Sequence, residues 1–235
     1  GARSLAPENT LAAAELAYEI GADMWELDVA MSSDGELFVV HDDSLERTSN
    51  AATAFPNRKP WSNHLFTLDE IRSLDFGSWY AEKDPFQQIA TGNVSKEQAE
   101  SYRGIQAPTL REALEFTRDR GWRVNVEIKD LSYTPGDASV VEKTIELVRE
   151  LGMLDRVIIS SFNHSYLTRA KLAEPAVVTA ALVSKPVADP VALLEQLGAQ
   201  AYNPSFSAIK ADAIAGIRAA GYDVYVWTVN DEPSM

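Results

Sequence analysis

Two neighbouring apolar segments of this chain each carry charged residues of types that do chemistry. Glu26 and Asp28 lie in the stretch MWELDVA, and His41 with Asp42 ends the stretch ELFVVHD. Side chains alternate along a strand, so Glu26 and Asp28 share one face. Charged groups are rarely left inside a sheet unless they are paired or hold a metal ion. The spacing therefore indicates two inward carboxylates, with a histidine close by at the end of the next strand.

A third segment, RVNVEIK, adds a carboxylate and a lysine to the same pattern. Asn125, Glu127 and Lys129 share one face of this predicted strand, while the apolar residues between them face the helices. Three carboxylates that converge repel one another unless a cation neutralises them. The chain has no cysteine, so oxygen ligands and a hard ion such as Mg²⁺, Ca²⁺ or Mn²⁺ fit better than zinc. Periodicity alone leaves a second interpretation open, a buried ion-pair network with Lys129 as the partner.

The segments that position these residues alternate between helices and apolar strands. We predict strands over residues 24–31, 36–42, 123–129, 156–162, 176–183, 201–206 and 222–229. We predict helices over residues 9–20, 109–121, 139–151, 163–172, 189–198 and 208–220. Such alternation indicates parallel βα units. No glycine-rich dinucleotide or phosphate loop follows any of these strands, so the predicted fold class is an α/β protein with a (β/α)8 TIM barrel, whose function lies at the carboxyl ends of the strands.

The strand count falls short of a closed barrel. It includes six barrel strands and one antiparallel hairpin partner, with none before the first helix and none after residue 229. The first and last strands of such a barrel are neighbours. We therefore expect that the first and last strands are missing from the given chain and that the parent chain extends beyond both ends.

Residues 47–106 differ in kind from the rest of this single domain, residues 1–235. They combine scattered proline, asparagine, glycine and aromatic residues with one short predicted helix, TLDEIRSL, and no clear strand. We interpret them as an irregular insertion that covers one end of the fold. Their position soon after His41 predicts a cap beside the charged residues. We expect the cap to tune which substrate enters, an expectation motivated also by its aromatic content: Trp61, Phe66, Trp79 and Tyr80.

The charge balance limits the partners of the protein. Against 21 Lys and Arg stand 35 Asp and Glu, a net charge of −14 over 235 residues. Such a charge disfavours nucleic acid and anionic membranes, so a bound anion needs local positive charge from a metal or from placed basic residues. No apolar run approaches the roughly 20 residues of a membrane span. We expect a soluble protein with a small-molecule substrate, and the sequence leaves open its oligomeric state and its compartment, cytoplasmic or secreted and periplasmic.

Several short motifs, taken together and in this order, resemble the glycerophosphodiester phosphodiesterase family. PENT occupies residues 7–10, ELD residues 26–28 and HD residues 41–42. Further motifs of that family follow along nearly the whole chain: LDFGSWY, APTLREAL, VEIK, SSF and VWTVN. The resemblance implies a distorted (β/α)8 barrel that hydrolyses phosphodiesters of glycerol to glycerol 3-phosphate and an alcohol. It also implies one divalent cation, Mg²⁺ or Ca²⁺, with Mn²⁺ as an alternative.

The resemblance also implies roles for particular residues. These are metal ligands at Glu26, Asp28 and Glu127, a phosphate contact from Lys129, a general acid–base role for His41, and packing of Trp227 against the substrate. Ordinary aromatic packing is the alternative for the tryptophan. We expect Glu8 and Asn9 to fix the start of the first helix below the site rather than to touch substrate. His64 and His164 match no motif of the family, and we interpret both as surface or loop histidines.

The resemblance is incomplete at both ends of the chain. Family members carry a first catalytic histidine and an arginine that would directly precede Gly1, so half of the acid–base pair is expected outside this sequence. A closing strand is likewise expected after the last motif. Two alternatives stay open: a related barrel phospholipase, of the sphingomyelinase D or phosphoinositide-cleaving type, and a non-catalytic barrel that binds a phosphorylated ligand.

Overall fold

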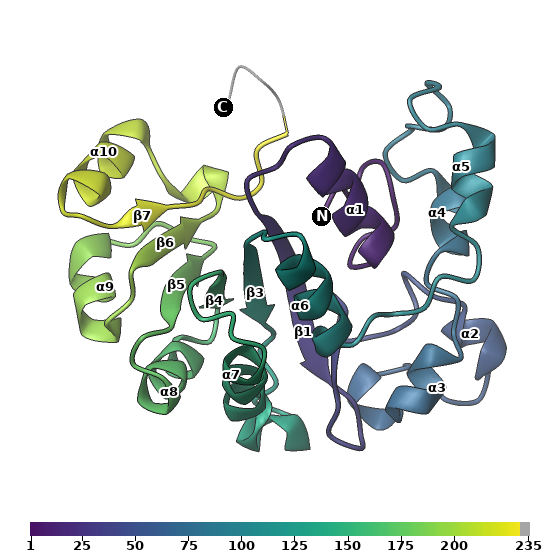
Figure 1. Cartoon of the computed structure of the whole chain (residues 1–235), viewed down its shortest axis with the longest axis horizontal. Coiled ribbons are helices and arrows are strands. Elements are labelled where there is room, and N and C mark those ends of the chain that lie inside the picture. The colour runs from purple at the N-terminus through teal and green to yellow at the C-terminus, as the bar shows by residue number, and fades with distance from the viewer. Residues whose placement is uncertain (231–235) are drawn as a thin grey trace.

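Alternating apolar residues build one curved sheet along the chain. The computed structural model describes residues 1–230, and its strands within that range form a single sheet in the order β2-β1-β3-β4-β5-β6-β7 (Figure 1). The strands are β1 (Trp25–Met31), β2 (Leu37–Val39), β3 (Val124–Ile128), β4 (Val157–Ser161), β5 (Val178–Val183), β6 (Ala201–Pro204) and β7 (Asp223–Val224). Strands β1 and β2 form the predicted antiparallel hairpin, whereas β1 and β3 to β7 run parallel.

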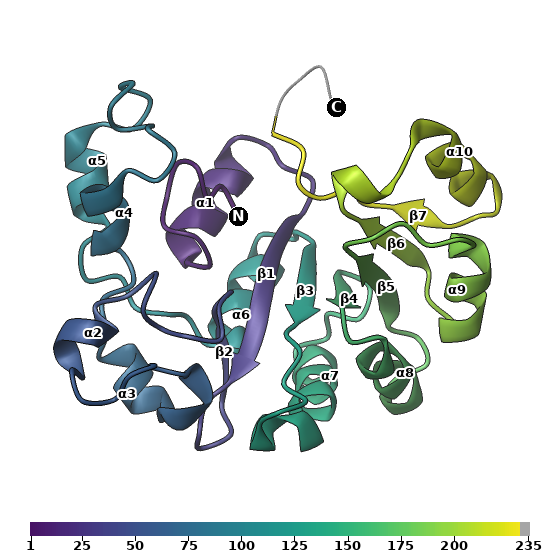
Figure 2. The same ribbon diagram turned by 180° about the vertical axis from the view of Figure 1, so that it is seen from behind.

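The helices that follow the parallel strands lie outside the curve of the sheet (Figures 1 and 2). They are α6 (Leu110–Asp119), α7 (Val140–Glu150), α8 (His164–Ala173), α9 (Pro190–Leu197) and α10 (Ala211–Ala219), and α1 (Leu11–Glu19) precedes β1. All six were predicted, and the architecture is that of the (β/α)8 barrel. Within the described residues, β1 and β7 do not pair with each other. None of the described helices is long and apolar enough to cross a membrane.

The last strand is shorter than predicted. β7 has two residues, whereas the predicted strand extended to residue 229. Tyr225 N still donates to Tyr202 O at 3.0 Å, and Trp227 N donates to Pro204 O at the same distance. Between these two hydrogen bonds, a regular ladder would have a third one, donated by the N–H group of residue 204. Pro204 has no N–H group, so that hydrogen bond is missing. The segment therefore lies beside β6 without forming a regular strand.

The two faces of the sheet bury different kinds of side chain. On the outer face, Leu27 and Val29 of β1 and their counterparts on β3 pack with the helices in the main apolar core. The inner face carries a much smaller apolar cluster at the start of the strands: Ile158, Ala180 and Ala201, with Met24, Val178 and Tyr225 against it. Above this cluster the inner positions of β1 and β3 are charged or polar. Period-two alternation therefore directs these groups into the barrel, as predicted.

Side-chain caps fix the starts of the two helices that flank β1. In α6 the cap is Thr109, the first residue of the predicted helix, whose Oγ1 accepts from Glu112 N at 3.1 Å, and Glu112 Oε2 accepts from Thr109 N at 2.8 Å. In α1 the cap is Thr10, whose Oγ1 accepts from Ala13 N at 3.3 Å. The prediction that Glu8 and Asn9 fix this helix start was therefore wrong, since a hydroxyl one residue later satisfies the first turn.

The insertion contains more helix than predicted. Its α-helices are α2 (Ala51–Ala54), α3 (Leu68–Arg72), α4 (Ser78–Lys83) and α5 (Lys96–Ser101), of which only α3 was predicted. Helices of four to six residues are too short for a periodic apolar pattern and are not stable alone. Tertiary packing stabilises them here. The helices lie beyond β1, on the side away from β3 to β7 (Figure 1).

The large aromatic residues of the insertion form its own cores. Trp61 and Phe66 pack with residues of the β1–β2 hairpin, and Trp79 and Tyr80 pack with α1 and α5. Each of the four is at most 6% exposed. The burial of these rings removes their aromatic content as support for a cap that tunes substrate entry, and the role of the insertion stays a prediction. Long-range contacts with the hairpin, α1 and α5 bury the rings.

Replacing Thr109 by Ala should lower the free energy of unfolding by about 1 kcal/mol, because the substitution removes the side-chain acceptor of the first turn of α6. Urea denaturation followed by circular dichroism measures this change. Thr53→Ala is a matched control, since Thr53 is exposed within α2, and it should alter the free energy of unfolding by less than about 0.5 kcal/mol. Equal losses in both variants would contradict the role of the cap.

Candidate active site

A large cavity lies on the inner face of the sheet, where β1 and β3 face the segment that follows β7. Its volume is about 1120 Å³. The sequence-predicted site residues all line it: Glu26, Asp28, His41, Glu127, Lys129 and Trp227. The insertion contributes Phe86 and Gln88 to the wall. Residues from distant parts of the chain therefore meet around one space, as expected for the carboxyl ends of parallel strands.

The three predicted carboxylates converge in this cavity. Parallel pairing of β1 with β3 sets Asp28 opposite Glu127, and alternation along β1 turns Glu26 to the same face. One oxygen of each carboxylate can lie within 4.8 Å of the others. Asp28 and Glu127 are buried, whereas Glu26 is open to the cavity. The arrangement is a set of oxygen donors on two rigid, adjacent strands.

Lys129 balances part of this charge. Its Nζ donates to Glu127 Oε1 at 2.9 Å and to Asp28 Oδ1 at 3.3 Å. Burial lowers the pKa of Lys129, but Asp28 and then Glu127 outweigh that effect and raise it to about 12. The lysine is therefore a cation at every physiological pH. The buried ion-pair network that strand periodicity left open as an alternative is therefore present. The single charge of Lys129 neutralises the charge of only one of the three carboxylates.

The carboxylate that Lys129 does not contact is strongly perturbed. Removal from bulk water, followed by repulsion from Asp28, raises the pKa of Glu26 to about 8. Burial and the charge of Asp28 also raise the pKa of Glu127. A surplus of buried negative charge with oxygen donors alone matches the preference of Mg²⁺ and Ca²⁺. The donor set therefore fits a divalent cation, which would replace the proton that Glu26 otherwise retains.

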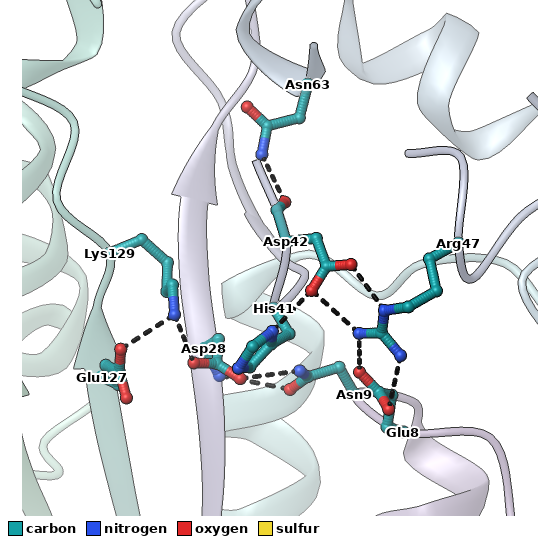
Figure 3. Close-up of polar contacts among 9 residues, drawn as sticks. All are labelled: Glu8, Asn9, Asp28, His41, Asp42, Arg47, Asn63, Glu127 and Lys129. Carbon is teal, nitrogen blue, oxygen red and sulfur yellow. Dashed lines mark hydrogen bonds and ion pairs between the residues drawn. The ribbon is translucent and has the colours of Figure 1, made fainter. Parts of the chain in front are cut away.

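Asn9 orients one of these carboxylates. Its Nδ2 donates to Asp28 Oδ2 at 2.8 Å, and its Oδ1 accepts from the Asp28 backbone N at 3.2 Å (Figure 3). The residue has a positive φ of 56°, which asparagine tolerates better than most residues. Sequence reasoning placed Asn9 at a helix start and missed this contact. The PENT motif was the signal that could have identified it.

His41 lies directly beyond β2, on the same side of the cavity as Asp28. Val40 N donates to Asp28 O at 3.0 Å, which fixes the end of the hairpin beside the carboxylates. His41 Nδ1 lies 2.6 Å from Asp42 Oδ1, and its side chain is 53% exposed. The hydrogen bond to Asp42 raises the pKa of His41. With Nδ1 engaged, Nε2 is the ring nitrogen left for exchange of a proton.

A guanidinium clamps the partner of this histidine. Arg47 Nε donates to Asp42 Oδ2 at 2.5 Å and its Nη1 donates to Glu8 Oε2 at 3.1 Å (Figure 3). Hydrogen bonds from His41 and then from Arg47 hold the pKa of Asp42 well below its usual range. Asn63 Nδ2 fixes the backbone carbonyl of Asp42 at 3.0 Å. Sequence reasoning missed Arg47, although it lies only a few residues beyond the HD motif.

Two aromatic residues form the opposite part of the wall. Trp227 Nε1 donates to Asn203 O at 2.9 Å, which sets the position of the indole. Phe162 meets it edge to face, with ring centroids 5.6 Å apart. Both rings line the cavity, and Phe162 is 43% exposed. Trp227 therefore lies where the resemblance implies it, and Phe162, the last residue of SSF, is a site residue that sequence reasoning missed.

The two remaining histidines do not line this cavity. His64 lies in a short 3-10 helix, Asn63–Leu65, and is half-buried. His164 begins α8, and its Nε2 lies 3.0 Å from Leu182 O. Neither lines the cavity, but the interpretation of both as surface or loop histidines was wrong in one respect, since both are half-buried in helices.

Comparison with known proteins agrees with this geometry. A glycerophosphodiester phosphodiesterase of Caldanaerobacter subterraneus is 33% identical over 230 residues, which are 97% of this chain and 83% of that protein. Its Bacillus subtilis counterpart is 31% identical over 244 residues, covering 100% of this chain and 76% of that protein. The structure of an Oleispira antarctica phosphodiesterase in complex with the product sn-glycerol-3-phosphate has a TM-score of 0.78 and 29% identity. The match between the two structures covers 100% of this chain and 84% of the Oleispira chain.

A sequence model of a whole family extends the match to every position. The model of the glycerophosphoryl diester phosphodiesterase family matches residues 1–235. Of the motifs that suggested the resemblance, PENT, ELD, HD, VEIK, SSF and VWTVN contribute residues to the cavity lining, whereas LDFGSWY and APTLREAL do not. The chain therefore belongs to the glycerophosphoryl diester phosphodiesterase family.

Proposed function

We propose that this protein hydrolyses glycerophosphodiesters to glycerol 3-phosphate and an alcohol with the help of one divalent cation. The observation that carries the proposal is the meeting of three carboxylates and Lys129 with the His41–Asp42 pair in one cavity. The similar enzymes are named for this reaction, and one was solved with the product sn-glycerol-3-phosphate. The names of these relatives favour this activity over a related phospholipase or a binding protein.

Glu26, Asp28 and Glu127 would hold the cation, Mg²⁺ or Ca²⁺ by preference for oxygen ligands, with Mn²⁺ as an alternative. Such a cation withdraws charge from the phosphoryl oxygens and orients the diester. Asn9 keeps Asp28 turned toward the site through two hydrogen bonds. Lys129 lies beside two of these proposed metal ligands and would neutralise the remaining negative charge of the phosphate.

His41 would move the proton. In the reaction the phosphorus–oxygen bond to the alcohol breaks, water adds to phosphorus, and the departing alkoxide takes a proton. An imidazole can donate or accept that proton near neutral pH. Asp42 orients the ring through Nδ1, so Nε2 is the nitrogen that would face the substrate.

The insertion would form a cap that selects the alcohol. Phe86 and Gln88, rather than its buried aromatic residues, line the cavity opposite Phe162 and Trp227. Phe86 is partly exposed, and the guanidinium carbon of Arg3 lies 5.6 Å from its ring centroid. The ring of Phe86 offers an apolar contact to the alcohol part of the diester, and the guanidinium of Arg3 offers it a positive charge.

Without a divalent cation, stability should fall as pH rises from about 4.5 to about 8. Over this window the folded protein binds a proton at Glu26 that the unfolded chain has released, because folding raises the pKa from 4.5 to about 8. Mg²⁺ should restore stability near pH 8 by replacing that proton. Urea denaturation midpoints, with EDTA or with Mg²⁺, measure both effects.

Glu26→Gln is the control, because glutamine mimics the protonated carboxyl. It should show a flatter pH dependence without Mg²⁺ and a smaller gain on adding Mg²⁺. The other titrating groups are the same in both proteins. Identical plots of urea midpoint against pH for wild type and variant would therefore contradict a raised pKa of Glu26.

Replacing His41 by Ala should reduce turnover of glycerophosphocholine by roughly 100- to 10,000-fold, since a general acid–base group is lost. Release of glycerol 3-phosphate measures the rate, and titration calorimetry should find metal affinity nearly unchanged. If the histidine is the acid, the loss should shrink for an ester with a phenolate leaving group, which needs no proton. Loss of metal binding would instead make His41 a ligand.

Replacing Phe86 by Ala should change the ratio of kcat/KM for glycerophosphocholine to that for glycerophosphoglycerol, by roughly tenfold. The phenyl ring is the apolar contact that the insertion offers in the cavity. Leu65→Ala is a matched control, because Leu65 is exposed in the insertion and does not line the cavity. An unchanged ratio in the Phe86 variant would remove the specificity role.

A further inference from the structure

Two consecutive residues connect the carboxylate cluster with the histidine. Asn9 holds Asp28 through its side chain, and Glu8 accepts hydrogen bonds from Arg47. Arg47 in turn holds Asp42, the partner of His41 (Figure 3). A continuous chain of contacts therefore runs from a proposed metal ligand to the proposed proton carrier, and its central member is Arg47.

The guanidinium of Arg47 serves two carboxylates at once. Nε and Nη2 donate to the two oxygens of Asp42, the second at 2.9 Å, while Nη1 and Nη2 donate to the two oxygens of Glu8. Forked pairs of this kind fix the angle as well as the distance between partners, which an ammonium cannot do. Lys83 Nζ also donates to Arg47 O at 3.1 Å, tying the loop to α4 of the insertion.

The same contacts exclude a second metal at this place. Glu8, His41 and Asp42 each offer a ligand atom within 4.8 Å of the others. The guanidinium already occupies both carboxylates, and its charge would repel another cation. The cluster is therefore organised around the arginine.

We infer that Arg47 is a positioning residue for phosphodiester hydrolysis. It locks the His41–Asp42 pair and the Glu8–Asn9 turn into one frame, so that the histidine and the carboxylate Asp28 keep a set separation. The inference rests on the proposed role of His41. Proton transfer requires alignment within a fraction of an ångström, and a displacement of about 1 Å can lower turnover roughly 100-fold.

The surroundings of Arg47 separate this role from a general contribution to stability. The side chains of Arg47, Asp42 and Glu8 are 43%, 28% and 12% exposed, so water screens these ion pairs only in part. The two partners are the residue before Asn9 and the residue after His41. Removing the guanidinium should therefore lower kcat far more than a comparable loss of unfolding free energy elsewhere in the chain.

The test compares Arg47→Ala and Arg47→Lys with Arg72→Ala in the full-length enzyme. Arg72 is a matched control, because it also bridges two polar side chains, Glu112 and Gln106, and lies 31% exposed on the insertion away from the cavity. We expect kcat for glycerophosphocholine to fall roughly 100-fold in Arg47→Ala and less in Arg47→Lys. KM and Mg²⁺ affinity should stay close to those of wild type, and the urea midpoint should fall no further than in Arg72→Ala.

Added guanidinium ion, at concentrations that do not unfold the protein, should restore part of the kcat of Arg47→Ala. It should not raise the kcat of Arg72→Ala, whose missing guanidinium lies away from the cavity, or of His41→Ala, which lacks an imidazole. Recovery of this kind requires a guanidinium-shaped gap beside Asp42 and Glu8, which a general loss of stability does not create.

Three results would overturn the inference. A large loss in His41→Ala with wild-type kcat in Arg47→Ala would remove the positioning role and leave the proposed function intact. Equal losses of kcat in Arg47→Ala and Arg72→Ala, with lowered urea midpoints and no rescue, would reduce Arg47 to a structural residue. Wild-type kcat in His41→Ala would instead refute the proposed role of the histidine, which the inference requires.

Discussion

Electrostatic repulsion inside the barrel is the constraint on which the rest of this structure depends. Pairing of β1 with β3 sets Asp28 opposite Glu127, and alternation turns Glu26 to the same side. Burial removes much of the water that would screen these charges, so each needs a compensating neighbour. Lys129 and Asn9 supply part of that compensation through hydrogen bonds to Asp28. The remaining negative charge makes this face of the sheet a candidate site for a cation rather than an apolar core.

The opposite face of the same strands supplies the stability that the charged face lacks. Leu27 and Val29 alternate with the carboxylates of β1 and are fully buried against the helices. The insertion adds cores of its own, in which Phe66 and Tyr80 are fully buried. Because most of the apolar packing lies outside the sheet and in the insertion, the cavity can stay open and polar without loss of the fold.

Predictions succeeded where a local pattern determined the structure and failed where distant contacts did. Alternation predicted the inward direction of Glu127, and the helix predicted from residue 109 begins there, with Thr109 as its cap. The helices α2, α4 and α5 were missed, because they are too short for a periodic pattern. The length of β7 was overestimated because Pro204 lies in the neighbouring strand β6. Its missing N–H interrupts the hydrogen-bond ladder between β6 and the segment that contains β7.

By itself, the sequence determined the class of fold, the apolar and polar faces of each strand, and the residue types of the site. These follow from the period of two along a strand and from the alternation of helix and strand, which are local properties of the backbone. Only the tertiary structure decided which side chains meet. Arg47 and Glu8 are 39 residues apart, and Lys129 and Asp28 are 101 apart. Their contacts depend on strand register and loop path, which no single segment encodes, because both are set by how the whole chain packs.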